Sequence, residues 1–337
     1  MKEPFVSVVV PMYNSQETIE SCLDSLINLD YPKDRYEIII VDDHSTDESV
    51  DIVKSFAYAN GNIRLLRQVK GKKGPAAARN LGIKRSKGEF IASTVSDEMM
   101  FSNWLNELLP SFSNNKTAAV GALLIEKHPL DKGLSPKIQS IIINPADKPS
   151  TVAAGNVIYR KEILHEMNGF NEFCVFNDLD VDLHYRMQEK GFELIAVQKY
   201  LGQHKQRHSI KAFYNRLKGF GAAGIIMSFF NFKEASKSKF KNQRGILQYF
   251  VLFAALIAYI AFLAIILFID PKIALSALIG ALGFLGIISL IWAFVRIKQT
   301  NSNILHLPLT AFYIFVKLIA IIHGVFYGLF YYLQRKK

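Results

Sequence analysis

The sequence predicts an α/β domain built on a mostly parallel sheet, followed by a C-terminal α-helical transmembrane region. Up to about residue 245, short apolar runs alternate with charged, amphipathic segments, a pattern typical of strands alternating with helices. Beyond that point the apolar runs become long and nearly uncharged, and the whole chain is 50% hydrophobic. We therefore expect an α/β domain at 1–230, a basic juxtamembrane linker at 231–245 and a region of two to three membrane helices at 246–337.

The first two strands and the helix between them follow from local pattern. Val6–Pro11 is a continuous apolar run, typical of a strand that is buried on both faces. Met12–Ser15 gives a loop and a helix N-cap before an amphipathic run that ends near Ile27. Glu37–Val41 repeats the strand pattern and ends on two adjacent aspartates. Acidic side chains therefore follow the second strand.

Further strand and helix units come next. A helix whose first-turn acids suit the helix dipole is expected from about Asp47, and a third strand at Asn62–Arg67. Gly71–Pro75 opens a helix whose face carries Arg79, and Glu89–Ser93 is the next strand. Because strands alternate with helices, the sheet should be mostly parallel, with its ligand site at the carboxyl ends of the strands.

The strand after this helix ends in two adjacent carboxylates, Asp97 and Glu98. Acidic side chains at this end of an open α/β sheet can hold a divalent metal or a ribose. No Gly-x-Gly-x-x-Gly follows the first strand and no Walker A lysine is present, so an NAD-binding domain and a P-loop NTPase are poorly supported. The expected ligand is a nucleotide held through its base and ribose.

Two uncharged runs, Ile246–Ile269 and Ile273–Val295, are each long enough to cross a bilayer as a helix. The alternative is a pair of buried helices in a large soluble domain. A basic loop follows the second run, and the positive-inside rule places that loop and the α/β domain in the cytoplasm. Ile304–Leu333 contains Lys317 and is expected to be a third span, with an interfacial helix or re-entrant hairpin as the alternative.

The formal charge of +11 is concentrated just ahead of the apolar runs. A basic cluster beside membrane spans is typical of a cytoplasmic flank that faces anionic lipid, and its placement argues against nucleic-acid binding. Its members are Lys205, Arg207, Lys211, Arg216, Lys218, Lys233, Lys237, Lys239, Lys241 and Arg244. Two cysteines are too few for a disulfide framework, and no signal-peptide pattern is present. We expect an integral membrane protein whose α/β domain is cytoplasmic.

Short motifs occur in a fixed order along the α/β domain. They are Val-Val-Val-Pro-Met-Tyr-Asn14, Ile-Val-Asp-Asp-His-Ser-Thr-Asp47, Ala-Ala-Arg-Asn-Leu-Gly82, Lys-Gly-Glu-Phe-Ile91, Gly155-Asn, Gly169-Phe-Asn and Asp180-Val-Asp-Leu183. As an ordered set over roughly residues 4–225, they resemble the family 2 glycosyltransferases. The resemblance implies a GT-A fold, which is a Rossmann-like mixed and mostly parallel sheet. It also implies a nucleotide-sugar donor and direct displacement with inversion at the anomeric carbon.

The resemblance places the donor nucleotide against the first loops. Pro11 and Tyr13 would border the base, and Asp43 would bind the base or the ribose; the alternative for Asp43 is a cap at a turn. Lys72, Lys73 and Arg79 are candidates for the diphosphate, because cations and a helix N-terminus suit phosphate oxygens. The alternative for each of these cations is a solvated charge.

The family has an Asp-x-Asp motif at the strand end, and Asp97 falls on its second carboxylate, the one closest to the Mg²⁺ or Mn²⁺. Val95 falls on the first, and valine cannot bind a ribose hydroxyl or a metal-bound water. Glu98 is the candidate to substitute as a ligand from the next position. Because a hard cation held mostly by waters and phosphates needs one or two protein carboxylates, a divalent metal (Mg or Mn) is the expected cofactor.

The resemblance also makes Asp180 the base that removes the proton from the acceptor hydroxyl, although the family's preceding Glu is Leu179 here. The alternative is that Asp180 and Asp182 cap the following helix, and Asp182 is expected to steady the helix start or a nearby loop. In related enzymes, the stretch that corresponds to Gln203–Ser209 is near the donor phosphates, and here it contains His204, Arg207 and His208. The alternative place of these three residues is the basic membrane flank.

The sequence therefore predicts a membrane-associated inverting glycosyltransferase that moves a sugar from a nucleotide-sugar donor to a lipid-linked or glycan acceptor at the cytoplasmic membrane face. The expected partners are the donor, the acceptor and membrane lipids, with no nucleic acid. Two alternatives stay open. One is a glycosyltransferase-like binding protein with weakened catalysis. The other is a processive polysaccharide synthase, which should have more spans and a Gln-x-x-Arg-Trp-like loop, whereas the run Gln203–Arg207 lacks the Trp.

Overall fold

The computed structural model describes residues 3–69, 74–127, 155–172 and 179–205, together with scattered helical residues between 214 and 330. The chain divides into two compact units, Met1–His128 with Asp147–Gln206 and Pro129–Ala146 with Arg207–Lys337. The predicted linker and the first predicted span lie outside the described residues. Within the parts of the chain that the structure describes, no helix is both long and apolar enough to cross a membrane.

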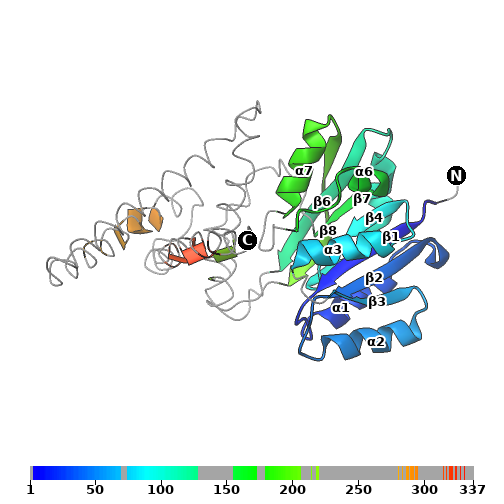
Figure 1. Ribbon diagram of the computed structural model, residues 1–337, viewed down its shortest axis with the longest axis horizontal. Coiled ribbons are helices and arrows are strands. Elements are labelled where there is room, and N and C mark those ends of the chain that lie inside the picture. Colours follow the sequence, from blue (N-terminus) through cyan, green and yellow to red (C-terminus); the bar gives the residue numbers. More distant parts are fainter. Residues whose placement is uncertain are drawn as a thin grey trace. The chain divides into compact units, whose positions relative to one another are not determined.

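A mixed eight-stranded sheet forms the frame of the first unit, with the strand order β3-β2-β1-β4-β7-β6-β8-β5 (Figure 1). The strands are β1 (Val6–Met12), β2 (Tyr36–Asp42), β3 (Ile63–Arg67), β4 (Phe90–Ser93), β5 (Glu98–Met100), β6 (Thr117–Lys127), β7 (Val157–Arg160) and β8 (Glu193–Lys205). The first four strands pair in parallel, as predicted. β7 is antiparallel to both β4 and β6, β8 is parallel to β6, and β5 is antiparallel to β8. The predicted mixed sheet is confirmed.

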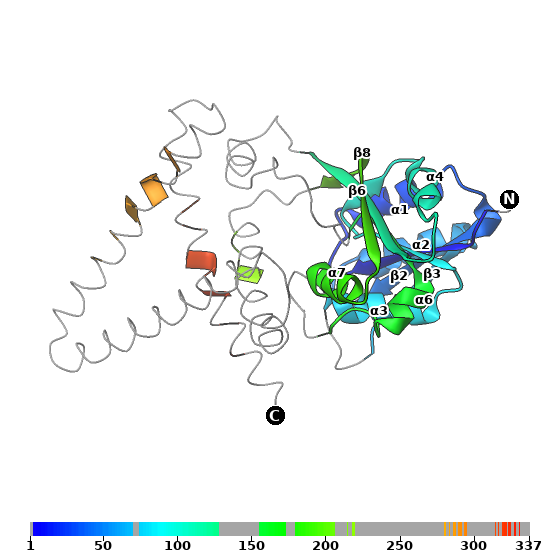
Figure 2. The same cartoon turned by 90° about the horizontal axis from the view of Figure 1, so that it is seen from above.

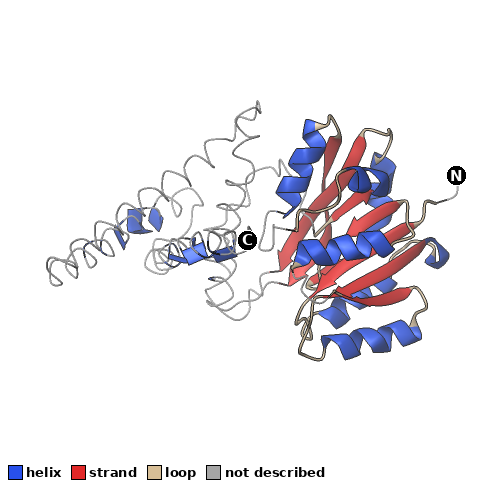
Figure 3. Cartoon of the chain, viewed as in Figure 1, coloured by secondary structure: helices blue, strands red, loops and turns tan. Residues whose placement is uncertain are grey.

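Helices cover both faces of this sheet. They are α1 (Ile19–Ile27), α2 (Ser49–Ala59), α3 (Pro75–Arg85), α4 (Trp104–Leu108), α6 (Lys161–Glu166) and α7 (Leu179–Glu189), with short 3₁₀ turns at η1 (Lys33–Arg35) and η2 (Leu109–Ser111). Seen from above, α1 and α4 lie on one side of the strands and α3, α6 and α7 on the other (Figure 2). The strands are thus the middle layer of a three-layer sandwich (Figure 3).

The two-sided cover explains the apolar runs of the central strands. In β2, Ile38 and Ile40 belong to the core on the α1 side, whereas Ile39 and Val41 pack with Ala78 of α3. Successive strand residues point to opposite faces, so a strand with both faces covered needs apolar residues at every position. β1 and β2 are accordingly buried throughout.

Small residues bring α3 close to the sheet. Ala76, Ala77 and Ala78 are buried, and a Cβ added at Gly82 would lie 2.4 Å from the Val9 side chain. A contact that short has no room for a methyl group. The alanine-rich motif therefore lets α3 sit low on β1 and β2, and it positions the buried Arg79 of the same helix.

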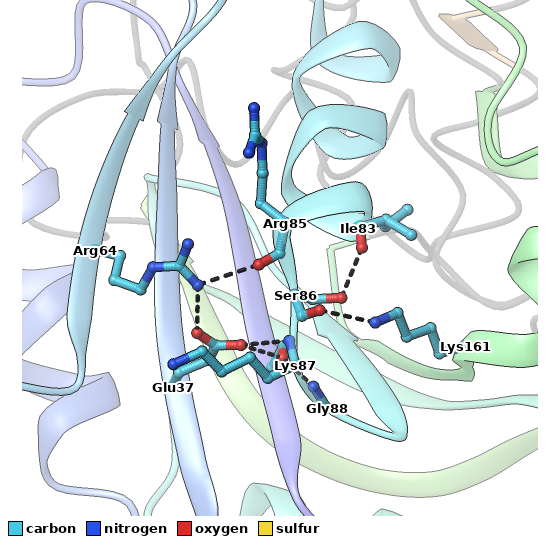
Figure 4. Close-up of polar contacts among 9 residues, drawn as sticks. Glu37, Arg64, Ile83, Arg85, Ser86, Lys87, Gly88 and Lys161 are labelled. Carbon is cyan, nitrogen blue, oxygen red and sulfur yellow. Dashed lines mark hydrogen bonds and ion pairs between the residues drawn. The ribbon is translucent and has the colours of Figure 1, made fainter.

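A buried hydrogen-bond network fixes the turn between α3 and β4 near the starts of β1 and β2 (Figure 4). The Glu37 carboxylate accepts hydrogen bonds from Ser7 Oγ (2.8 Å), the Lys87 N–H (2.6 Å) and Arg64 Nη1 (2.7 Å). The Gly88 N–H donates to Ser7 Oγ at 2.8 Å. Burial raises the pKa of Glu37, but the hydrogen bonds from Arg64, Lys87 and Ser7 outweigh it, and the pKa is lowered. Glu37 is therefore a buried carboxylate that stays charged.

Candidate active site

The loops after β1 and β2 are tied together at the carboxyl end of the sheet. The Asn14 N–H donates to Ser45 Oγ (3.0 Å), and the Thr46 N–H donates to Asn14 Oδ1 (2.8 Å). Asn14 and His44 have φ angles of 47° and 67°, left-handed values that are found in tight turns. Asp42 Oδ1, at the end of β2, accepts a hydrogen bond from the Ser45 N–H at 3.0 Å. The two loops form one fixed rim.

The residues predicted to hold the nucleotide lie along this rim. Pro11 is buried in β1, and Tyr13 just beyond it is 57% exposed. Asp43 Oδ2 accepts a hydrogen bond from the Gly74 N–H at 2.7 Å, and Gly74 is the N-cap of α3 with a φ of 97°. Lys73, which precedes it, lies outside the described residues. Asp43 thus joins the β2 loop to the start of α3; the contacts of these residues with a nucleotide stay predictions.

Ser15 connects three loops and does not cap the first helix. The Ser15 N–H donates to Ser49 Oγ at 2.7 Å, and its own hydroxyl shares a hydrogen bond with Ser96 Oγ at 2.7 Å. α1 begins later, at Ile19, with Thr18 at the N-cap. The predicted helix start was wrong because these loop contacts occupy the Ser15 side chain. Their effect is to fix Ser96, the neighbour of Asp97, against the β1 loop.

Asp97, which directly precedes β5, lies beside a histidine of the neighbouring strand β8. Asp97 Oδ2 is 3.4 Å from His204 Nε2, and the two side chains are 28% and 22% exposed. The β5–β8 ladder brings them together, because it pairs Glu98 with His204. One carboxylate oxygen and one imidazole nitrogen at this spacing can supply two ligands to a divalent cation.

Glu98 has different surroundings from Asp97. It is buried, it accepts a hydrogen bond from Thr94 Oγ1 at 2.9 Å, and a Cβ added at Gly155 would lie 2.2 Å from its Oε1. Burial raises the pKa of Glu98 to about 8, against the opposing effects of His204 and the Thr94 hydrogen bond. This environment favours the neutral acid near pH 7, and the ligand role of Glu98 stays a prediction.

Few of the side chains that the structure describes near Asp97 could bind a divalent metal. Among the described residues, no three His, Cys, Asp or Glu side chains are grouped to hold a metal ion. Asp97 and His204 nevertheless suit a hard cation whose remaining ligands are phosphate oxygens and waters, since such sites need few protein ligands. The residues fit a metal that binds together with a phosphate ligand.

Arg79 of α3 is a buried cation beside the end of β4. Its side chain is 3% exposed, and its Nε donates to Ser93 Oγ, at the end of β4, at 3.1 Å. Burial lowers the pKa of the Arg79 guanidinium, while Tyr159, Asp180 and Glu98 act in the opposite direction. The charges of Asp180 and of Glu98, the neighbour of Asp97, therefore both act on Arg79. The contact of Arg79 with a diphosphate stays a prediction.

Asp180 lies in the first turn of α7, where the helix dipole favours a carboxylate. One turn later on the same face is His184, which is 2% exposed and has Nε2 2.9 Å from the Tyr159 hydroxyl. Burial lowers the pKa of His184 to about 4, against Asp180, which raises it. Burial also raises the pKa of Tyr159. At neutral pH the hydrogen-bonded side chains of Tyr159 and His184 are therefore both uncharged.

Asp182 and Arg207 were the remaining residues with a predicted role. Asp182 forms an ion pair with Arg186 at 2.8 Å, and Arg186 binds the turn after α6, so the expectation that Asp182 steadies a nearby loop is confirmed. Arg207 lies outside the described residues. The contact of His184 with Tyr159 could not be predicted from the sequence, because a single histidine on a helix face has no distinguishing local pattern. Arg186 could have been found from its i, i+4 spacing to Asp182.

Known proteins share this sequence pattern. Residues 7–167 match the family described as Glycosyl transferase family 2. Over these residues the chain is similar to a family 2 glycosyltransferase domain. "Glycosyltransferase AglE" of Haloferax volcanii is 27% identical over 208 residues, which are 60% of this chain and 68% of the relative. The "Dolichyl N-acetyl-alpha-D-glucosaminyl phosphate 3-beta-D-2,3-diacetamido-2,3-dideoxy-beta-D-glucuronosyltransferase" of Methanococcus voltae is 26% identical over 247 residues, 66% of this chain and 74% of the relative.

The fold of the α/β domain also has solved counterparts. The mannosyltransferase PcManGT from Pyrobaculum calidifontis, solved with GDP-Man and Mn²⁺, matches with a TM-score of 0.58 and 18% identity. The match covers 96% of this chain and 88% of that one. It shows that the fold is GT-A-like. Together with relatives that are named as glycosyltransferases, the family match identifies the chain as a glycosyltransferase.

Proposed function

We propose that the α/β domain transfers a sugar from a nucleotide-sugar donor to an acceptor hydroxyl, with inversion at the anomeric carbon. The observation that carries this proposal is the Asp97–His204 pair, 3.4 Å apart at the edge of the sheet, in a domain that also places Asp180 in the first turn of α7. A base and a phosphate-neutralising site are the two parts that such a displacement needs. The mannosyltransferase of similar fold was solved with a nucleotide sugar and Mn²⁺, which supports the choice of donor.

Asp180 acts as the general base in this proposal. Its carboxylate takes the proton of the acceptor hydroxyl while the oxygen forms a bond to the anomeric carbon. The bond from that carbon to the diphosphate oxygen breaks, and the nucleoside diphosphate leaves with the electron pair. Tyr159 and His184 are neutral, so they add no positive charge near Asp180. A positive charge there would stabilise the carboxylate and make it a weaker base. A positioned base of this kind contributes about 10²–10⁴-fold to the rate.

The leaving diphosphate needs positive charge near it. Arg79 supplies a permanent cation from α3, and Lys73 and Arg207 are predicted to contact the same phosphates. A divalent metal held by Asp97 and His204 would, when bound, neutralise charge that develops on the leaving group. Val95 leaves this site one carboxylate short of the family pattern. We therefore expect weaker metal binding than a full Asp-x-Asp motif would give.

The acceptor is proposed to be lipid-linked or a glycan, at the cytoplasmic face of a membrane that the C-terminal region spans. In the second unit, the helical residues Ile287, Leu290, Ile291 and Phe294 share one face and are 48–57% exposed, while Ala293 is fully buried. An exposed apolar face of this kind suits lipid contact. The basic cluster between residues 205 and 244 supports the cytoplasmic side. The name of the Methanococcus voltae relative includes a dolichyl-linked sugar phosphate, which supports a lipid-linked acceptor.

The proposal is tested with the full chain in detergent. A panel of nucleotide sugars is assayed for transfer to lipid-linked sugars and for hydrolysis, with Mn²⁺ and with EDTA. We expect turnover of one donor that EDTA suppresses and that Asp180→Asn lowers by about 10²–10⁴-fold. Asp51→Asn is the matched control, because Asp51 is an exposed carboxylate in a surface ion pair with Lys54. Full activity of the Asp180→Asn variant would remove the base assignment.

A second function, binding of a nucleotide sugar without turnover, is favoured by Val95. The two functions differ in a simple measurement. A binding protein would show a raised melting temperature with one donor and no product, in the presence of Mn²⁺. Val95→Asp separates them further, since restoring the carboxylate should then create turnover in a protein that had none.

A further inference from the structure

The turn after α6, at residues 167–172, is held by a side chain of α3. Asn80 Nδ2 donates to the Phe170 carbonyl at 2.8 Å, and Asn80 Oδ1 accepts from the Phe170 N–H at 2.8 Å. One amide therefore satisfies both backbone groups of one residue, which fixes its orientation. Gly169 has a φ of 71°, and a Cβ there would lie 2.4 Å from Asn80 Oδ1. Backbone conformation and space both require glycine at this position.

The same turn is held by α7. Arg186 Nη1 donates to the Met167 carbonyl at 2.6 Å, and Nη2 donates to the Gly169 carbonyl at 2.9 Å. Arg186 Nε donates to Asp182 Oδ2 at 2.9 Å, and Asp182 is 4% exposed. The planar fork of arginine can serve these three acceptors at once, and a lysine ammonium cannot reproduce that geometry. The turn is therefore clamped between two helices.

The two helices carry the residues that the proposed reaction uses. Arg79 directly precedes Asn80, and its guanidinium lies 5.8 Å from the centre of the Phe170 ring. The Phe170 ring packs edge-on against Tyr159 at 5.9 Å, and Tyr159 hydrogen-bonds to His184 of α7. Asp180 is in the first turn of α7, just before Asp182. The clamped turn thus connects the helix of a donor-side cation to the helix of the base.

We propose that Asn80 and Arg186 are positioning residues for sugar transfer, which set the separation of Arg79 and Asp180 by gripping the 167–172 turn from α3 and α7. The inference rests on the proposed role of Asp180 as base. Neither residue needs to touch the substrate. A displacement of the base by about 1 Å is enough to cost about 10²-fold in rate, because transfer requires a near-attack geometry.

The test compares Arg186→Gln, Arg186→Lys and Asn80→Asp with wild type, in the full chain with the donor found in the panel assay. Asn80→Asp keeps the acceptor for the Phe170 N–H and loses the donor to the Phe170 carbonyl. We expect kcat to fall about 10–100-fold in each variant, while the KM for the nucleotide sugar stays within about twofold. The acid limb of the kcat–pH profile should also move, because the surroundings of Asp180 change.

A matched control lies between α6 and the end of α7. Lys190, the residue after α7, forms an ion pair with Glu166 of α6 at 3.0 Å, through side chains that are 51% and 49% exposed. Lys190→Gln removes a contact between α6 and the end of α7 without touching the turn. Its kcat should stay at the wild-type value.

Each outcome decides the inference. If wild type is active, Asp180→Asn is inactive and the clamp variants keep kcat and the pH profile, the positioning role is refuted and the proposed function stands. A loss of activity that only follows a lower melting temperature, with kcat restored at lower assay temperature, also refutes it. If wild type turns over no donor, the proposed function and the positioning role fall together. Should Arg186→Gln not fold, Asn80→Asp, which retains one of the two bonds to Phe170, supplies the same comparison.

Discussion

Replacing His184 with glutamine should remove a loss of stability that sets in as the pH falls below about 6.5. In the folded protein the pKa of His184 is lowered from 6.5 to about 4 by burial. Between these values the unfolded chain binds a proton that the folded chain does not, so folding stability rises with pH across this window. The contribution is fully present above pH 6.5 and is lost as the pH approaches 4. A difference of about 2.5 pH units at 1.36 kcal/mol each corresponds to about 3 kcal/mol.

Glutamine is the informative replacement because it cannot titrate and still offers an amide to the Tyr159 hydroxyl. The assay is thermal unfolding of the full chain in detergent between pH 7.5 and 4. The quantity of interest is the difference in melting temperature between wild type and variant. Groups present in both proteins, such as Glu37, cancel in that difference. We expect wild type to lose roughly 6–12 °C relative to the variant over the window, at 2–4 °C per kcal/mol for a domain of this size. Parallel curves would refute the burial argument for His184.

Three further predictions concern single carboxylates and their neighbours. Gly155→Ala should lower stability by about 1–3 kcal/mol in thermal unfolding, because a Cβ would lie 2.2 Å from Glu98 Oε1; an unchanged melting temperature would show that Glu98 moves freely. Glu37→Gln should cost about 1–3 kcal/mol at pH 7. Because folding lowers the pKa of Glu37, this cost should shrink as the pH falls through the folded pKa, and a pH-independent cost would contradict it. Asp97→Asn should abolish stimulation of turnover by Mn²⁺, whereas Glu98→Gln, which mimics a neutral acid, should change it much less; equal effects would show that both carboxylates bind the metal.

The strands that carry the site were predictable because their signals are local. β1 and β2 are buried on both faces, so every position is apolar and each run stops where its loop begins. The start of α3 at Pro75 was predictable from the Gly71–Pro75 segment, because proline is favoured in the first turn of a helix. Asp43 and Asp97 could be placed at the carboxyl ends of strands because each follows an apolar run.

The resemblance placed His204 near the donor phosphates, but the contact of its side chain with Asp97 could not be predicted, since it depends on a distant strand pairing. His204 reaches Asp97 through the β5–β8 ladder, which joins segments about a hundred residues apart. The adjacency of Asp97 and Glu98 in the sequence also did not predict that their side chains have different surroundings. Asp97 and Glu98 are neighbours in the chain, but successive residues entering a strand point to opposite sides, and Glu98 turns into the core. The Tyr159–His184 pair joins β7 to α7 and has no local signal at all.

The position of β8 determines where the polypeptide can be shortened. The family match ends at residue 167, and a fragment cut there would lack both Asp180 and His204. A cut after α7 would keep Asp180 but leave β5 and the outer edge of β6 without their ladder partner. A fragment intended to retain the catalytic unit should therefore continue through Lys205, one residue past His204. The last strand of the sheet thus carries the final residue of the candidate site, and it is also the last described segment of the first unit before its boundary at Gln206.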